Sequence, residues 1–186
     1  MSIGYPGYVT EQPDAGHGQV WATDAEARAL ASAVRLRILR VCLDRAYTNK
    51  EIADRLDLNP ASTLHHVRTL LATGFLVAEA ERRGARGARE VPYRATRKSW
   101  AVRRREPQPT GQGAMLEAFL ADLEQSGGPE QEMPMARLGL RLTTDELAEL
   151  GLRLKGLLDE YASRPPTPEG RPYSMFVAVH PDPTRE

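Results

Sequence analysis

The chain has 186 residues, of which 41% are hydrophobic, enough to bury one ordinary core or a small core with an attached module. Its 25 basic and 25 acidic residues cancel, and its single cysteine excludes a disulfide framework or a multi-thiolate metal site within one chain. The first residues do not form a basic and apolar leader, and no run of about 18 apolar residues follows. We therefore expect a cytoplasmic protein that is neither exported nor membrane-spanning.

The charges are unevenly distributed along the chain. Residues 21–106 contain 18 Lys and Arg against 10 Asp and Glu, while the rest contains 7 against 15. This split favours a nucleic-acid-binding part joined to an acidic part. Residues 1–20 are rich in Gly and Pro and contain no Lys or Arg, so we expect an irregular arm without a role in DNA binding.

Residues 24–73 carry the pattern of several short helices. Apolar residues recur at helical spacing over 24–45, which predicts one or two helices. Thr48 and Glu51 form a capping-box pattern that predicts a helix over 49–56. Asn59 and Pro60 then predict a helix over 60–73, with Gly74 at its left-handed end. Only residues 57–59 connect these two helices, which is typical of a helix-turn-helix.

A hairpin is predicted directly after these helices. Phe75 and Val77 indicate one strand and residues 91–96 a second, and the segment RRGARGAR between them forms a basic tip that contains glycine. Because Pro92 has no N–H to donate, we expect the second strand to pair on one side only.

The segments LASAVRLRILRVCL, TNKEIADRLDLNPASTLHHVRTLLATGFLVAEAERRG and VPYRAT resemble the ArsR-like winged-helix regulators, over about 70 residues. MarR-like and other winged helices share much of this pattern. The resemblance implies a winged helix-turn-helix, double-stranded DNA as partner and, commonly, repression. Many metal-sensing members place paired cysteines in the helix before the DNA-reading one. The corresponding segment here, NKEIADRL, has no thiol, so the metal switch is not carried over.

In a winged helix, the helix from Pro60 enters the major groove, where its outward side chains meet base edges or phosphates. The candidates are polar: Ser62, Thr63, His65, His66, Arg68 and Thr69. His65 is the better candidate for base contact, because the resemblance implies a partly structural role at His66. The alternative is a solvated helix face. Adjacent histidines point about 100° apart on a helix, so they do not chelate one metal ion.

Residues 82–105 form the strongest electrostatic feature, with ten Lys and Arg against Glu90 alone. We expect the arginines of the hairpin tip to bind the phosphate backbone or the minor groove, where each neutralised phosphate releases counterions. They are Arg82, Arg83, Arg86 and Arg89. The alternative, here too, is a solvated charged face.

The predicted fold class is mainly α with small β (α+β). A winged helix-turn-helix over 21–105 and a linker over 106–111 precede a C-terminal region over 112–186. That region contains an amphipathic helix over 112–126, a strand over 136–142, a helix started by Thr143 and a buried strand over 173–179.

The C-terminal region has two compatible predicted uses. It forms a homodimer through residues 112–126, 143–162 or both, and it encloses a small apolar effector in a pocket formed by Tyr161, Tyr173, Met175 and Phe176. A winged helix used for protein contact is an alternative, because fold does not give function. The sequence has no nucleophile motif, phosphate-binding glycine loop or metal-ligand cluster. We therefore expect neither an enzyme, nor a cofactor, nor a metal site.

Overall fold

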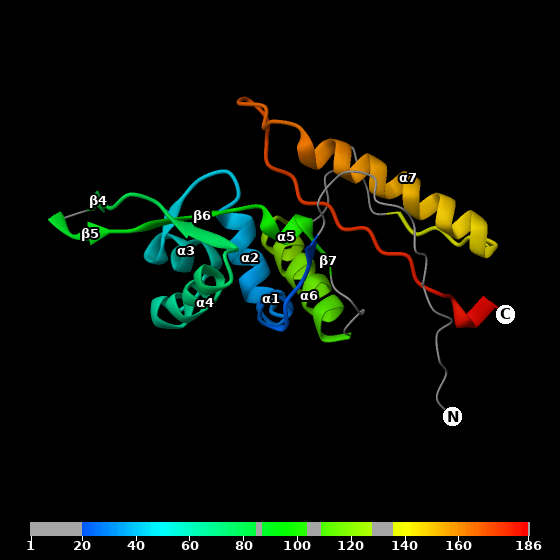
Figure 1. Cartoon of the computed structure of the whole chain (residues 1–186), viewed down its shortest axis with the longest axis horizontal. Helices are drawn as coiled ribbons and strands as arrows, with labels where there is room; N and C mark the ends of the chain where they lie inside the picture. Colours follow the sequence, from blue (N-terminus) through cyan, green and yellow to red (C-terminus); the bar gives the residue numbers. More distant parts are fainter. Residues whose placement is uncertain (1–19, 85–86, 104–108, 128–135, 186) are drawn as a thin grey trace.

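The computed structural model describes residues 20–84, 87–103, 109–127 and 136–185 (Figure 1). The helices are α1 Asp24–Leu30, α2 Ala33–Val41, α3 Asn49–Leu56, α4 Pro60–Ala72, α5 Lys98–Ala101, α6 Pro109–Gln125 and α7 Thr144–Ser163, with a short 3₁₀ helix over Pro183–Arg185. The strands are β1 Val20–Trp21, β2 Tyr47–Thr48, β3 Leu76–Ala78, β4 Arg82–Arg83, β5 Arg89–Glu90, β6 Pro92–Ala95 and β7 Val102–Arg103.

Local capping signals set where the helices begin. Capping boxes start α1, α3 and α7, with Thr48 and Glu51 forming the one at α3. The Asn59 side chain accepts from the Ala61 amide at 2.8 Å, and Pro60 occupies the first turn of α4. Gly74 follows α4 with a φ of 71°, so the predicted left-handed end is confirmed.

A small antiparallel sheet has the strand order β2, β6, β3, and the hairpin continues outward through β4 and β5. β6 therefore pairs on both sides, and the prediction that Pro92 restricts this strand to one neighbour is wrong. β2 is only two residues long, and Thr48 at its end lies opposite Pro92. Pro92, which has no N–H, thus lies where the pairing of β6 with β2 ends, so the pairing with β2 can still form.

One hydrophobic core joins the first four helices to the sheet. Its largest fully buried side chains include Ile38, Ile52, Leu70 and Phe75, which come from α2, α3, α4 and the turn after α4. Helices α3 and α4 with their connecting turn, followed by the hairpin, form a winged helix-turn-helix. Figure 1 shows the hairpin extending from the end of the molecule that holds α3 and α4. The fold prediction is confirmed at this level, and the ArsR-like assignment within the fold stays a prediction.

Helix α6 packs against α1 and α2 and so extends the winged-helix unit. Its buried face consists of small residues, Ala114 and Ala118. At its end, the Arg37 guanidinium of α2 lies 2.7 Å from the Asp122 carboxylate. The helix begins at Pro109, inside the predicted linker over 106–111.

The C-terminal region departs from the predicted strand, helix, strand order. Helix α7 begins at its capping box as expected, and each of its residues, all of them described, keeps some exposure. Residues 136–142 and 173–179 form no ladder in the described chain, so both predicted strands are wrong. Their apolar pattern suits a strand, but Leu138 and Val179 remain 77% and 59% exposed because neither segment has a partner strand.

Among the described residues, no helix combines the length and apolar character that crossing a membrane requires.

Candidate nucleic-acid interface

The turn between α3 and α4 fixes the orientation of α4. Asp57 ends α3 in the left-handed conformation with a φ of 53°, and the Leu58 amide donates to the Ala53 carbonyl at 2.9 Å. The Asn49 side-chain amide donates to the Pro60 carbonyl at 2.8 Å. The first of these hydrogen bonds holds the turn against the last turn of α3, and the second joins the first turn of α3 to the start of α4.

The outward face of α4 carries polar side chains. Ser62, His65 and Arg68 are exposed, and their spacing of three residues places them along one side of the helix. Arg68 forms no ion pair with another described residue. The helix therefore presents hydroxyl, imidazole and guanidinium groups that can hydrogen-bond to base edges or phosphates.

Thr63 lies on the opposite, inward face, and the prediction that it contacts DNA is wrong. Its side chain is fully buried, and its hydroxyl donates to the Asn59 carbonyl at 3.0 Å. Thr63 precedes the buried Val67 by four residues and Leu70 by seven, so the helical period directs it into the core. Thr69 is half-buried and donates its hydroxyl to the His65 carbonyl at 3.1 Å, which leaves it at the margin of the outward face.

His66 is half-buried and differs from its exposed neighbour His65. Burial lowers the pKa of His66, and the nearby charges of Arg35 and His65 lower it further. Its buried Nδ1 has no hydrogen-bond partner among the described residues. Arg35, whose charge acts on His66, is held in place because it donates to the carbonyls of Arg28 and Ala29 at 2.7 and 2.6 Å. The lowered pKa favours the neutral form of His66, and its partial burial makes it less suited to base contact than His65.

Ion pairs fix the outer strand of the hairpin. The Arg82 guanidinium lies 2.8 Å from Glu51 of α3 and 3.4 Å from Glu90 of β5. This arrangement ties the hairpin to the helix-turn-helix, so Arg82 serves first to position the hairpin.

The remaining hairpin arginines differ in how free they are. Arg89 is 86% exposed and lies 3.2 Å from Glu81, an exposed pair of a kind that contributes little stability and that a phosphate can replace. Arg83 is exposed and pairs with no carboxylate among the described residues. Arg86 lies outside the described residues. Among the described arginines of the hairpin, Arg83 is thus the best placed to bind a phosphate.

The basic residues within 82–105 form ion pairs with acidic residues from other parts of the chain. Carboxylates from several elements pair with Arg82, Arg89, Arg94, Arg97 and Lys98; they are Glu26, Asp44, Glu51, Glu79, Glu81 and Glu90. Glu90 is the only acidic residue within 82–105, and the other partners lie outside this run. The positive potential comes from fewer groups than the sequence predicts.

The four residues predicted to enclose an effector do not come together in one cavity. Tyr173 lines a cleft beside α2, whereas the Phe176 ring stacks on the Phe119 ring at a centroid distance of 5.2 Å. Tyr161 is 59% exposed beneath the Arg164 guanidinium, and Met175 is 59% exposed. The structure does not support the predicted pocket in that form.

No group of three or more His, Cys, Asp or Glu residues in the described part of the chain has the spacing to hold an ion. Cys42 is buried in the core, and burial raises the pKa of its thiol to about 12. A thiol in this state is a small hydrophobic side chain rather than a ligand or a nucleophile.

Comparison with known proteins yields weak similarities only. No protein-family model and no curated protein sequence matches the chain. Among solved structures, reduced HlyU from Vibrio cholerae is 21% identical over 52% of this chain and 84% of its own, with a TM-score of 0.33. A possible transcriptional regulator from Methanosarcina mazei is 14% identical, over 56% of this chain and 81% of its own, with a TM-score of 0.35. A mutant of ZitR from Lactococcus lactis is 18% identical, over 77% and 84%, with a TM-score of 0.33. Similarities this low add nothing to the described geometry.

Proposed function

We propose that the chain is a sequence-specific transcriptional regulator that binds double-stranded DNA as a homodimer and represses the genes it controls. Helix α4 lies in the major groove, and the hairpin lies along the backbone or the adjacent minor groove. The observation that carries this proposal is the exposed face of α4, which presents Ser62, His65 and Arg68. Helix α4 and the basic hairpin lie toward the same end of the molecule (Figure 1).

The two elements have different roles in binding. Arg83 and the exchangeable Arg89 supply affinity that does not depend on sequence, because phosphates are the same along the duplex. Ser62, His65 and Arg68 supply sequence preference, since a guanidinium binds guanine in a bidentate manner and a hydroxyl suits several bases. His66 and Thr69 support this face from its margin.

The dimer is proposed to form through α6. While its small residues pack on α2, the neighbouring stripe stays open: Met115, Leu116 and Leu120 are 40%, 45% and 52% exposed. An apolar stripe of this kind is buried when two copies associate around a two-fold axis. The paired α4 helices then meet half-sites one helical turn apart.

Selection of bound sequences from random duplex DNA with the purified chain tests the proposal. The expected result is an enriched palindrome whose half-sites are separated by about one helical turn. Affinity should fall with added salt, with a slope of about −0.9 per phosphate contact. Bound DNA without any enriched sequence would reduce the protein to a non-specific binder. Absence of DNA binding at low salt would favour the alternative, a winged helix that contacts protein.

A further inference from the structure

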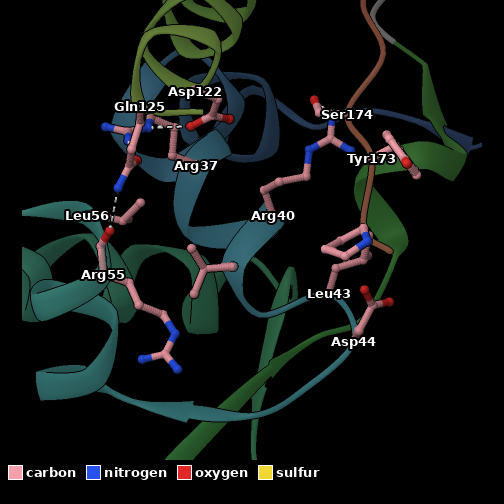
Figure 2. Close-up of a pocket in the computed structure, with 12 residues that line it drawn as sticks. Arg37, Arg40, Leu43, Asp44, Arg55, Leu56, Asp122, Gln125, Tyr173 and Ser174 are labelled. Atoms are coloured by element: carbon pink, nitrogen blue, oxygen red, sulfur yellow. Dashed lines mark hydrogen bonds and ion pairs between the residues drawn. The ribbon is translucent and has the colours of Figure 1, made fainter. Parts of the chain in front are cut away.

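We propose that a cleft between α2, α3, α6 and the C-terminal segment binds a small organic carboxylate with an aromatic or branched apolar body. This site rests on the proposed function, in which the ligand would regulate DNA binding. The cleft has a volume of about 410 Å³ and is lined by Arg37, Arg40, Arg55, Leu43, Asp122 and Tyr173, among others. Figure 2 shows the three arginines arranged around it.

The cleft has more cationic than anionic groups. Arg37 is neutralised, because its guanidinium lies 2.7 Å from the Asp122 carboxylate and donates to the Gln125 side-chain oxygen at 2.7 Å. Asp44 lies 3.8 Å from Arg97, which is not part of the lining. Neither Arg40 nor Arg55 has a carboxylate partner among the described residues. An anion entering the cleft therefore meets two cations whose charge is not yet balanced.

Arg40 is the better anchor of the two. Arg55 lies over the Tyr47 ring, with its guanidinium carbon 4.1 Å from the ring centroid, and this stacking already occupies one face of the group. Among the described residues, the Arg40 side chain donates one hydrogen bond, of 2.9 Å, to the Ser174 hydroxyl. A carboxylate that accepts two parallel hydrogen bonds from a guanidinium binds more strongly than a neutral hydroxyl does. The ligand carboxylate would thus replace Ser174 at Arg40.

Apolar side chains complete the lining and determine the rest of the ligand. Val41, Leu43 and Leu56 contribute aliphatic surface, and Tyr173 together with Pro172 covers it from the C-terminal segment. Such a surface favours an aromatic or branched body over a polyhydroxylated one or a free inorganic anion. The class implied is therefore a monocarboxylate with an apolar body, and not the uncharged apolar effector that the sequence predicts.

The location of the cleft connects it to both parts of the proposed DNA-binding dimer. Arg55 and Leu56 belong to the last turn of α3, which only three residues separate from α4. Gln125 of α6 donates to the Arg55 carbonyl at 3.0 Å, so α6 and α3 meet at the edge of the cleft. A ligand here would displace the Ser174 hydroxyl from Arg40 and change how α3 and α4 sit relative to the α6 dimer helix. Affinity for DNA would change accordingly.

Calorimetric titration of the full chain with 3-phenylpropanoate tests the site, with the uncharged 3-phenylpropanamide as the matched ligand. We expect saturable binding of the acid and at least about tenfold weaker binding of the amide. Arg40→Gln should reduce binding of the acid to the level of the amide. Arg153→Gln, which removes an exposed arginine of α7 paired with Glu149, should leave it unchanged. Equal binding of acid and amide, unaltered binding by Arg40→Gln, or no binding up to about 10 mM would overturn the proposal.

The DNA affinity of the ligand-free chain separates this inference from the proposed function. If the ligand-free chain fails to bind any duplex, the proposed function fails whatever the titration shows. If it binds DNA and the titration fails, only the carboxylate site is lost. Binding at Arg40 with no change in DNA affinity would support the site and overturn its regulatory role.

Discussion

The Arg82 guanidinium lies 2.8 Å from both carboxylate oxygens of Glu51, so the outer strand of the hairpin is joined to the first turn of α3. The same carboxylate accepts the Thr48 amide at 2.7 Å and thereby caps α3. Both side chains of the pair are about 40% exposed, and exposed pairs of this kind contribute little to stability. Their main effect is geometric, because they fix the hairpin relative to α3.

Substituting Arg82 and Arg83 separately should distinguish positioning from phosphate contact. Arg82→Gln should weaken DNA binding while leaving the dependence of affinity on salt nearly unchanged, because Arg82 pairs with Glu51. Arg83→Gln should lower the magnitude of the salt slope by about 0.9 per monomer. Fluorescence anisotropy over a series of salt concentrations measures both slopes. An equal loss of slope in the two variants would assign Arg82 to the phosphate backbone.

Two neighbouring hydroxyls of α4 should behave in opposite ways. Thr63→Val removes a buried hydroxyl that donates to the Asn59 carbonyl, so the free energy of unfolding should fall by about 1 kcal/mol while the preferred DNA sequence stays the same. Ser62→Ala changes an exposed hydroxyl and should alter the preference for one base pair without a loss of stability. Urea denaturation and binding to single-base variants of the selected site provide the two readouts. A changed base preference in Thr63→Val would place that residue back in the interface.

The helices were predictable because their signals are local. The start of α3 is determined by Thr48 and Glu51, and the start of α4 by Asn59 and Pro60. The two residues of each pair lie close together in sequence. The strands predicted over 136–142 and 173–179 failed because a strand exists only when another segment completes its hydrogen bonds. An apolar alternation in the sequence does not identify that partner.

The polar composition of the outward face of α4 was predictable, but not fully which residues belong to that face. Ser62, His65 and Arg68 lie outward as expected, whereas Thr63 belongs to the inward period that the buried Val67 and Leu70 define. The ion pair between Arg82 and Glu51 was not predictable, because the two residues lie 31 positions apart in sequence. Folding brings such partners together, and counting charges along the basic run misses them.

Acid should destabilise the protein partly through Glu26. Hydrogen bonds from Lys98 and Thr23 lower the pKa of Glu26 from 4.5 to about 2. A carboxyl whose pKa is lower in the folded state stabilises the fold above pH 4.5, and this contribution is lost as the pH falls toward 2. Glu26→Gln should therefore be less stable than the parent chain at pH 6, with the difference shrinking toward pH 2. A pH-independent difference in urea midpoints between the two proteins would contradict this origin.

Cys42 should be unreactive in the folded protein. Burial raises the pKa of its thiol to about 12, so almost no thiolate exists at neutral pH, and the side chain is also inaccessible. Ellman's reagent should label the native chain at the rate of global unfolding, and should label the urea-unfolded chain at once. Rapid labelling under native conditions would mean that the core around α2 opens locally.

The open stripe of α6 makes the most demanding prediction, because it concerns a second copy of the chain. A glutamate at the centre of an apolar two-fold interface meets its own symmetry mate, so desolvation and like-charge repulsion act together. Leu120→Glu should therefore produce a monomer in sedimentation velocity, with unchanged circular dichroism because Leu120 is 52% exposed in the isolated chain. Affinity for the full palindrome should fall toward that for a single half-site, since the second contact is no longer tethered. Leu138→Glu, at a residue that is 77% exposed outside α6, is the matched control and should remain dimeric. If Leu152→Glu in α7 yields the monomer and Leu120→Glu does not, the interface lies on α7.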